Sequence, residues 1–140
     1  MRTLLTTMRL RLRPFTFADA EELHALFSDR ETNTIGSGPF TSLAETHRWI
    51  QNRIAAQSEH GLCWYALRGI DTDQLIGNCG MLRGRSTYAE PELGYMIHKK
   101  HQGQGLASEA ATAVLKECRA SGIQRASGPA SDLTTPRRAG

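Results

Sequence analysis

The amino-acid sequence predicts an α+β fold with a mixed, mostly antiparallel central sheet flanked by helices, and three observations lead to this class. The chain has 140 residues, the usual size of one domain with a single hydrophobic core. Strand-like and helical segments occur in the order strand, two helices, three strands and one helix. The three consecutive strands are joined by short turns, which favour antiparallel neighbours.

The first strand and the first helix are predicted near the N-terminus. Residues 9–13 alternate arginine with leucine, which is typical of a half-buried strand, and Pro14 ends it. This alternation directs the arginines outward. Thr16 or Asp19 can then cap a helix that continues to about Phe27.

A second helix is predicted after a loop over residues 29–40. The sequence Ser42-Leu43-Ala44-Glu45 has the form of a capping box, so we expect the helix to begin there and to continue to about Ser58. His60-Gly61 ends it, because glycine commonly follows the last helical residue.

Three strands are predicted next, over residues 62–68, 74–82 and 92–98. Turn residues Asp71-Thr72-Asp73 separate the first two, and a polar loop over 83–89 precedes the third. Gly77 and Gly80 indicate a bulge or close packing. The third strand is mostly apolar, which predicts a central position in the sheet.

A long helix and a tail are predicted at the C-terminal end. The helix is expected from Gly103 to about Ala120, and Ile123–Arg125 is expected to begin a strand joined by a right-handed crossover, the one parallel element. Residues 126–140 are rich in serine, proline, alanine and arginine, which predicts a disordered tail. The expected division is therefore a domain over 1–125 and a tail over 126–140.

Composition and charge exclude several classes of function. Hydrophobic residues make up 39% and charged residues 22% of the chain, and the mean hydropathy is −0.42, which together indicate a soluble globular protein. The net charge of +3 belongs to the two ends, because residues 15–118 hold 9 bases and 13 acids. No aromatic platforms are interleaved with the arginines, so a nucleic-acid partner is not expected. No segment approaches the roughly 20 apolar residues of a membrane span, so no membrane partner is expected either.

Cysteine usage and the N-terminus predict a cytoplasmic location. Cys63, Cys79 and Cys118 are odd in number, widely spaced and in apolar surroundings, which favours reduced, buried thiols. The N-terminal residues are too rich in arginine for a signal peptide. No metal is expected, because His98 and His101 lie across a loop with no third ligand.

The segment between the predicted strand at 92–98 and the long helix holds the residues that are most suited to binding a ligand. It holds Gly103 and Gly105 immediately before the helix. A helix start offers free N–H groups and a positive dipole end, which suit a phosphate or pyrophosphate. The alternative is that the glycines only make a tight turn. The junction lacks the lysine of a P-loop and the third glycine of a dinucleotide fingerprint.

Gln102-x-x-Gly105-x-Ala107 resembles the Q/R-x-x-G-x-G/A motif of the GNAT N-acetyltransferase superfamily. The stretch GYMIHKKHQGQGLASEA, residues 94–110, is similar to the branch that acetylates protein N-termini, including those of ribosomal proteins. The start of the chain, LRLRPFTFADAEELHALFSD, also resembles the family's first strand and helix. The resemblance implies an acyl-CoA N-acyltransferase fold whose central strands splay apart to admit acetyl-CoA.

The resemblance also implies which residues bind this co-substrate. Backbone N–H groups from Gln102 through Gly103, Gln104, Gly105 and Leu106 to Ala107 would hold the CoA pyrophosphate, and backbone groups of Met96, Ile97 and His98 would bind the pantetheine arm. Lys99 and Lys100 could add positive charge nearby. The family transfers the acetyl group directly to a free amine, either a protein N-terminus or a small molecule.

An amine that is cationic at neutral pH must lose a proton before it attacks. Glu92, at the start of the third predicted strand, is the expected general base. Glu90, nearer the loop, and His98, whose ordinary pKa suits the task, are the alternatives.

The match to the family stops near Arg125. A complete member continues with another strand, an Asn-containing segment, another helix and a further hairpin strand, so the resemblance implies a truncated C-terminus with those strands missing. Such a chain is expected to expose the sheet edge at 92–98 and to self-associate or form a homodimer through it. The second hypothesis for function is therefore a non-catalytic remnant that binds CoA weakly or acts only through self-association.

Overall fold

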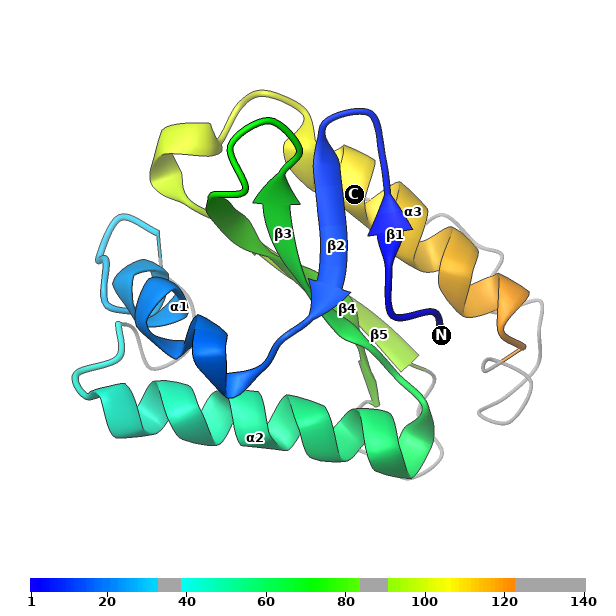
Figure 1. The fold of residues 1–140 in the computed structure, drawn as a ribbon, viewed down its shortest axis with the longest axis horizontal. Helices are drawn as coiled ribbons and strands as arrows, with labels where there is room; N and C mark the ends of the chain where they lie inside the picture. Colours follow the sequence, from blue (N-terminus) through cyan, green and yellow to red (C-terminus); the bar gives the residue numbers. More distant parts are fainter. Residues whose placement is uncertain (33–38, 84–90, 123–140) are drawn as a thin grey trace.

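Five antiparallel strands form the centre of the computed structural model, which describes residues 1–32, 39–83 and 91–122. The sheet order follows the chain (Figure 1). Its strands are β1 (Leu5–Thr6), β2 (Leu10–Pro14), β3 (Trp64–Gly69), β4 (Leu75–Arg83) and β5 (Pro91–Ile97). The helical elements are η1 (Phe17–Asp19), α1 (Ala20–Phe27), α2 (Leu43–His60), η2 (Lys99–His101) and α3 (Leu106–Ala120).

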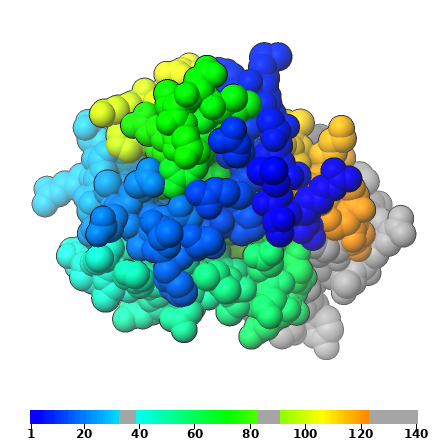
Figure 2. All heavy atoms as spheres, viewed as in Figure 1, coloured from blue at the N-terminus to red at the C-terminus, as the bar shows by residue number. Residues whose placement is uncertain are grey.

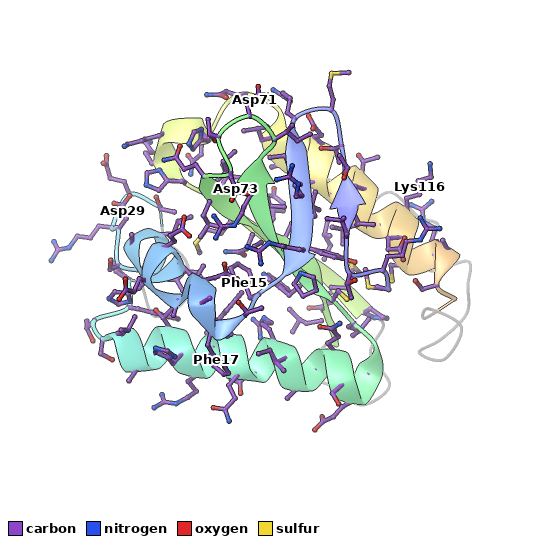
Figure 3. The ribbon with its side chains drawn as sticks, in the orientation of Figure 1. Phe15, Phe17, Asp29, Asp71, Asp73 and Lys116 are labelled. Carbon is purple, nitrogen blue, oxygen red and sulfur yellow. The ribbon has the colours of Figure 1, made fainter. Side chains whose placement is uncertain are left out.

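Helices cover both faces of the sheet, so the protein has two cores. Leu10 and Leu12 of β2 point to one face and pack with α3 residues such as Val114. The other face, built around Trp64 and Ala66 of β3, packs against α1 and α2. Phe15 turns into this second core where the chain leaves β2, and Phe17 lies beside α2 (Figure 3). The alternation in β2 therefore decides which side chains meet which helix.

The predicted fold class is confirmed, with α1, α2 and β2 to β5 close to their expected positions. Ser42 caps α2 by accepting the Glu45 N–H, and Gly61 ends the helix in the left-handed conformation. In a capping box the Glu45 side chain would accept the N–H of the N-cap residue Ser42. Here it accepts the N–H of Thr41, one residue earlier. The strand β1 was not expected, because two residues carry no periodic signal.

One predicted feature is wrong in detail, and another stays a prediction. Among the described strands, β5 lies at the edge of the sheet and Tyr95 is 45% exposed, while the central position predicted for β5 depends on the strand expected at 123–125. The long helix begins at Leu106, because Gly103 and Gly105 adopt left-handed angles that a helix does not allow. The described strands pair only antiparallel. The loop over 84–90, the strand expected at 123–125 and the expected tail over 126–140 lie outside the described residues.

Glycines in β4 and β5 let the Trp64 side chain lie against the sheet. A Cβ atom on Gly80 would collide with the Trp64 backbone, and one on Gly94 would collide with the Trp64 ring. A Cβ atom on Gly77 would meet the Met96 carbonyl oxygen. The prediction of close packing at Gly77 and Gly80 is therefore confirmed, and the same reason applies at Gly94.

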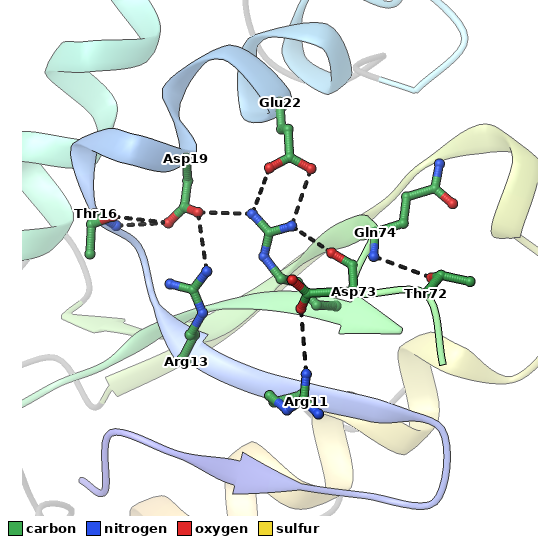
Figure 4. A network of polar contacts seen from close by, with 9 residues as sticks. Arg11, Arg13, Thr16, Asp19, Glu22, Thr72, Asp73 and Gln74 are labelled. Atoms are coloured by element: carbon green, nitrogen blue, oxygen red, sulfur yellow. Dashed lines mark hydrogen bonds and ion pairs between the residues drawn. The ribbon is translucent and has the colours of Figure 1, made fainter. Parts of the chain in front are cut away.

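A charged network joins β2, β3 and the start of α1 (Figure 4). The Arg68 guanidinium is 2.8 Å from both Asp19 Oδ1 and Glu22 Oε1. Arg13 approaches the same Asp19 oxygen at 3.5 Å, and Asp19 also accepts the Thr16 N–H. Because the Arg68 and Asp19 side chains are 6% and 3% exposed, this pair is desolvated and each charge depends on the other.

The cysteines are free and buried, as expected. Burial raises the pKa of the Cys79 thiol to about 12 and also raises the pKa values of Cys63 and Cys118. Thiols with raised pKa values are poor nucleophiles at neutral pH. Within the described parts of the chain, no helix is long and apolar enough to cross a membrane.

Candidate active site

The connection from β5 to α3 is held by its own side chains. The Gln102 amide Nε2 donates to the Ile97 carbonyl at 3.0 Å, and His98 Nδ1 accepts the Lys100 N–H at 3.1 Å. Gly105 then occupies the N-cap position of α3 with φ of +78°. The glycine conformation allows the chain to turn abruptly from the strand into the helix.

A pocket of about 400 Å³ opens where the outer edge of β5 meets the start of α3. Seven of the nine residues predicted to bind the co-substrate line it, and His98 and Gln104 do not. The seven are Met96, Ile97, Gln102, Gly103, Gly105, Leu106 and Ala107. Thr32, Tyr95, His101 and Ser108 complete the lining, and none of these four was among the residues predicted to bind the co-substrate.

The start of α3 presents backbone donors to this pocket. The first bond inside the helix runs from the Glu109 N–H to the Gly105 carbonyl at 3.1 Å. The N–H groups of Leu106, Ala107 and Ser108 precede it and have no intrahelical carbonyl to reach. Together with the positive end of the helix dipole, they suit an anionic group such as a phosphate.

The outer edge of β5 presents a second set of backbone groups. The His98 N–H donates to the Ile76 carbonyl at 2.8 Å, and antiparallel pairing alternates between neighbouring residues. Met96 and His98 therefore direct their backbone groups toward β4, while Ile97 and Tyr95 direct theirs outward. The sequence reasoning had assigned pantetheine contacts to the backbones of all three residues 96–98, but the geometry leaves the Ile97 N–H as the outward donor. The strands from β1 to β5 stay paired, so none of them splays apart.

The N–H groups of the connecting segment are partly used as well. The Gln102 N–H donates to the Lys99 carbonyl at 3.3 Å, so Gln102 shapes the loop with both its backbone and its side chain. This contact corrects the expectation that a phosphate would be held by N–H groups from Gln102 onward. The available donors begin after this residue.

Glu92 lies on β5 but outside the pocket. It is exposed and pairs in register with Leu82, on the face of the sheet that carries α1 and α2. Met96, which lines the pocket, lies on the same face four residues later, about 13 Å along an extended strand. His98, one alternative base, is partly buried with Nε2 3.9 Å from Asp29 Oδ2. Glu90, the other alternative, lies outside the described residues.

The loop after α1 is attached to the same junction. Thr32 Oγ1 accepts the Lys99 N–H at 3.1 Å and donates to Asp29 Oδ2 at 2.8 Å. Figure 3 places Asp29 at the turn that follows α1. The Thr32 hydroxyl, with further help from the Glu31 N–H, lowers the pKa of Asp29. The segment before the pocket and the segment after α1 therefore hold each other in place.

The N-terminal hairpin braces the other side of the pocket. Arg9 Nη1 donates to the Gln104 carbonyl at 2.9 Å, and Arg9 Nε donates to Glu109 Oε1 at 2.8 Å. Glu109 Oε2 also accepts the Arg9 N–H and the Thr7 hydroxyl. Figure 2 shows the N-terminal segment lying against α3, where the Arg2 N–H donates to Glu117 at 2.7 Å. This brace joins residues about one hundred positions apart, so no local sequence signal could have revealed it.

Glu109→Gln is expected to lower the free energy of unfolding by about 1–2 kcal/mol at neutral pH, because hydrogen bonds to a carboxylate are lost. Burial opposes the charged form, but the bonds from Thr7 and Arg9 outweigh it and leave the pKa of Glu109 below its ordinary value. A carboxylate with a lowered pKa stabilises the fold above its unfolded pKa and loses this effect as the pH falls through its folded pKa. The difference from the unchanged protein should therefore shrink in acid.

Urea unfolding at several pH values measures this difference. Glu59→Gln is the matched control, since the Glu59 side chain is 70% exposed and should change stability by less than about 0.5 kcal/mol. A Glu109→Gln effect that is the same at every pH would contradict a role for the carboxylate charge.

In the described ranges, no group of three or more histidine, cysteine, aspartate and glutamate side chains is placed to hold a metal ion. The polar features of this site are instead backbone donors at a helix start and an open strand edge, a combination that suits an extended anionic ligand. An antiparallel sheet with helices on both faces and such a site defines the acyl-CoA N-acyltransferase class of fold.

Comparisons with known proteins agree with this class. A family model described as an acetyltransferase (GNAT) domain matches residues 9–132, so the chain belongs to the GNAT acetyltransferase family. It is 33% identical over 107 residues to the uncharacterized N-acetyltransferase p20 of Bacillus licheniformis. The matched segment covers 76% of this chain and 60% of that relative. The chain therefore spans about three fifths of the length of this relative.

Solved structures show the same fold. An acetyltransferase from Agrobacterium tumefaciens superposes with a TM-score of 0.70 at 28% identity, covering 84% of this chain and 67% of that one. The ribosomal-protein α-N-acetyltransferase RimL in complex with coenzyme A superposes with a TM-score of 0.71 at 19% identity, covering 86% and 70%. At the second identity the likeness concerns the fold alone.

Proposed function

We propose that this protein transfers the acetyl group of acetyl-CoA to a primary amine, either a protein N-terminus or a small molecule. The observation that carries the proposal is the pocket of about 400 Å³ at the edge of β5 and the start of α3, with its row of backbone donors. Membership of the GNAT family and the CoA-bound relative RimL support the identity of the co-substrate.

The residues of the pocket fit an acyl-CoA. A Cβ atom on Gly103 would meet no atom of the described residues within 4 Å, so a ligand can approach this backbone closely. The N–H groups of Leu106, Ala107 and Ser108 would hold the pyrophosphate, and the outward Ile97 N–H would hold the pantetheine arm or polarise a carbonyl. Bound acetyl-CoA would supply a thioester that is activated toward attack by an amine.

Glu92 is proposed as the group that accepts the proton of the amine. Because it lies about 13 Å along the strand from Met96, it would act through water or on an acceptor that extends along the face of β5. An exposed carboxylate at this position would also attract a cationic amine.

Calorimetric titration with acetyl-CoA, followed by a thiol-release assay with a panel of amines, tests the proposal. We expect saturable binding together with release of free CoA that depends on the amine. Binding without turnover would favour the second candidate, a non-catalytic protein that associates with itself. The absence of any binding would contradict both candidates.

Glu92→Gln is expected to lower kcat by about 100-fold, within the range typical for loss of a general base. Affinity for acetyl-CoA should stay within about twofold, because Glu92 lies outside the pocket. Glu21→Gln, an exposed carboxylate on α1, serves as the control and should leave both values unchanged. Unchanged turnover in Glu92→Gln would remove it as the base and direct attention to His98.

Two observations support the second candidate and the proposed location. Among the described strands, the outer edge of β5 has no neighbouring strand, and such an edge can pair with a second copy of the chain. For this second candidate we propose a homodimer through this edge, which sedimentation at increasing protein concentration would detect. The three free, buried cysteines support a reducing compartment, the cytoplasm.

A further inference from the structure

Arg53, on the side of α2 that faces the sheet, is a partly buried cation without a counter-ion among the described residues. Its guanidinium forms no ion pair or hydrogen bond with any described residue, and its Nε atom is buried without a partner. Burial lowers the pKa of this side chain. Arg68 and Arg13, on the face of the sheet that carries α1 and α2, each contact the Asp19 carboxylate.

Two tryptophan rings hold the Arg53 guanidinium in place. Its central carbon lies 4.5 Å from the ring centroid of Trp49 and 4.7 Å from that of Trp64. The two rings meet edge to face, with their centroids 5.9 Å apart. Such cation–π contacts fix the orientation of the side chain while leaving its hydrogen-bond donors unused.

Asn78 supplies an independent sign of a missing acceptor on the same face. Asn78 is only 2% exposed. The Asn78 Oδ1 atom accepts the Trp64 indole N–H at 3.0 Å, but the Nδ2 atom is buried and has no partner. Buried donors are almost always paired in folded proteins, and in the described part of the chain only Arg53, Asn78 and the Nε atom of Arg68 have a buried side-chain donor without a partner.

The Trp64 ring connects these donors to the proposed reaction site. Its outer edge lies over Gly94 of β5. On that face of β5, the neighbouring side chains are those of Glu92 and Met96, two residues away on either side. The Arg53 guanidinium therefore lies on the indole whose outer edge borders this stripe.

We propose that Arg53, assisted by Asn78, binds a carboxylate on the acceptor, which makes the preferred substrate an amine that also carries a carboxylate, such as an amino acid or an acidic peptide. The inference rests on the proposed acetyl transfer and adds the class of acceptor. A planar carboxylate matches the planar guanidinium and can accept two of its N–H groups. A single guanidinium balances one negative charge, which favours a carboxylate over a doubly charged phosphate.

Tryptophan fluorescence offers a direct test, because the chain contains two tryptophans and both contact Arg53. The probes are N-acetylalanine and N-acetylalaninamide, which resemble acetylated products and differ in the carboxylate. We expect the acid to change the emission saturably and to bind at least tenfold more tightly than the amide. Arg53→Gln should abolish this preference, and Arg53→Met, which keeps the apolar stem against the rings, provides the same test if the first variant folds poorly.

Arg48→Gln is the matched control, since Arg48 is an exposed residue on the same helix. It should retain the preference for the acid. An equal response to acid and amide, a preference that survives in both Arg53 variants, or no response at about 10 mM probe, well above a millimolar dissociation constant, would overturn the proposal.

The corresponding kinetic measurement compares alanine with alaninamide as acceptors. We expect a tenfold or greater ratio of kcat/KM that falls to about one in Arg53→Gln. Failure of acetyl transfer to every amine would contradict the proposed function, while the fluorescence result would still decide the role of Arg53. Transfer to both amines at equal rates would leave the function standing and overturn the carboxylate preference.

Discussion

Arg68→Met is expected to lower the free energy of unfolding by about 3–5 kcal/mol, the usual cost of removing one partner from a buried ion pair. The substitution leaves Asp19, whose side chain is 3% exposed, with Arg13 as its remaining cation at 3.5 Å. It also removes the two bonds from Arg68 to Glu22 (Figure 4). Because single domains are stable by only about 5–15 kcal/mol, this loss is a large share of the total.

Urea unfolding followed by circular dichroism measures the effect. Arg11→Met is the control, because the Arg11 and Asp73 side chains are 40% and 67% exposed and their 3.4 Å pair lies in solvent. This control should change stability by less than about 1 kcal/mol. The double variant Arg68→Met with Asp19→Asn should recover part of the loss, since the uncompensated buried charge is gone. A loss in Arg68→Met no larger than in Arg11→Met would contradict the importance of burial.

Gly105→Val is expected to weaken acetyl-CoA binding by at least about 100-fold, equivalent to the loss of one or two hydrogen bonds to a charged group. Gly105 has φ of +78° at the N-cap of α3, a conformation that strongly disfavours β-branched side chains. Among the described residues, the side chain near its added Cβ would be that of Arg9, with Nη2 at 3.6 Å. The folded protein therefore has room for a side chain at position 105. The expected loss of acetyl-CoA affinity comes from a changed loop conformation and from the valine side chain, which would block access to the N–H groups at the start of α3.

Gly122→Val separates backbone strain from ligand binding. Gly122 has φ of +74° beyond the C-terminal end of α3, and its added Cβ would meet no described atom within 4 Å. Both valine variants should lose about 1–2 kcal/mol of stability through the strained conformation. Calorimetry with acetyl-CoA should show lost binding in Gly105→Val alone. Equal affinity in the two variants would place the co-substrate away from this loop.

Features that depend on neighbouring residues were predictable from the sequence. The arginine–leucine alternation over 9–13 located β2, and Ser42 and Gly61 located the two ends of α2. The same holds for the phosphate-type loop, because Gly103 and Gly105 next to a helix are a local pattern. Its resemblance to the GNAT motif, and the family itself, followed from that short segment.

Features that depend on distant residues were not predictable. The apolar sequence of β5 cannot say whether a strand lies on its other side, and among the described strands β5 lies at the edge of the sheet. Thr32 joined the pocket because the turn after α1 packs on the junction, through the bond from the Lys99 N–H. The His98 N–H is bonded to the Ile76 carbonyl of β4, and the Gln102 N–H is bonded to the Lys99 carbonyl within the loop. These bonds depend on how the segments meet, so the sequence could not show that the two N–H groups are already paired.

The sequence by itself therefore determined the fold class, most of the elements and the position of the candidate co-substrate loop, since periodicity, caps and glycine turns act within a few residues. Tertiary structure alone decided how that loop is braced, because Arg9 and Glu109 are one hundred positions apart. It also placed Arg53 on Trp49 and Trp64 without a carboxylate. The physical reason is that burial and pairing depend on which segments meet in space, and the strand order sets this.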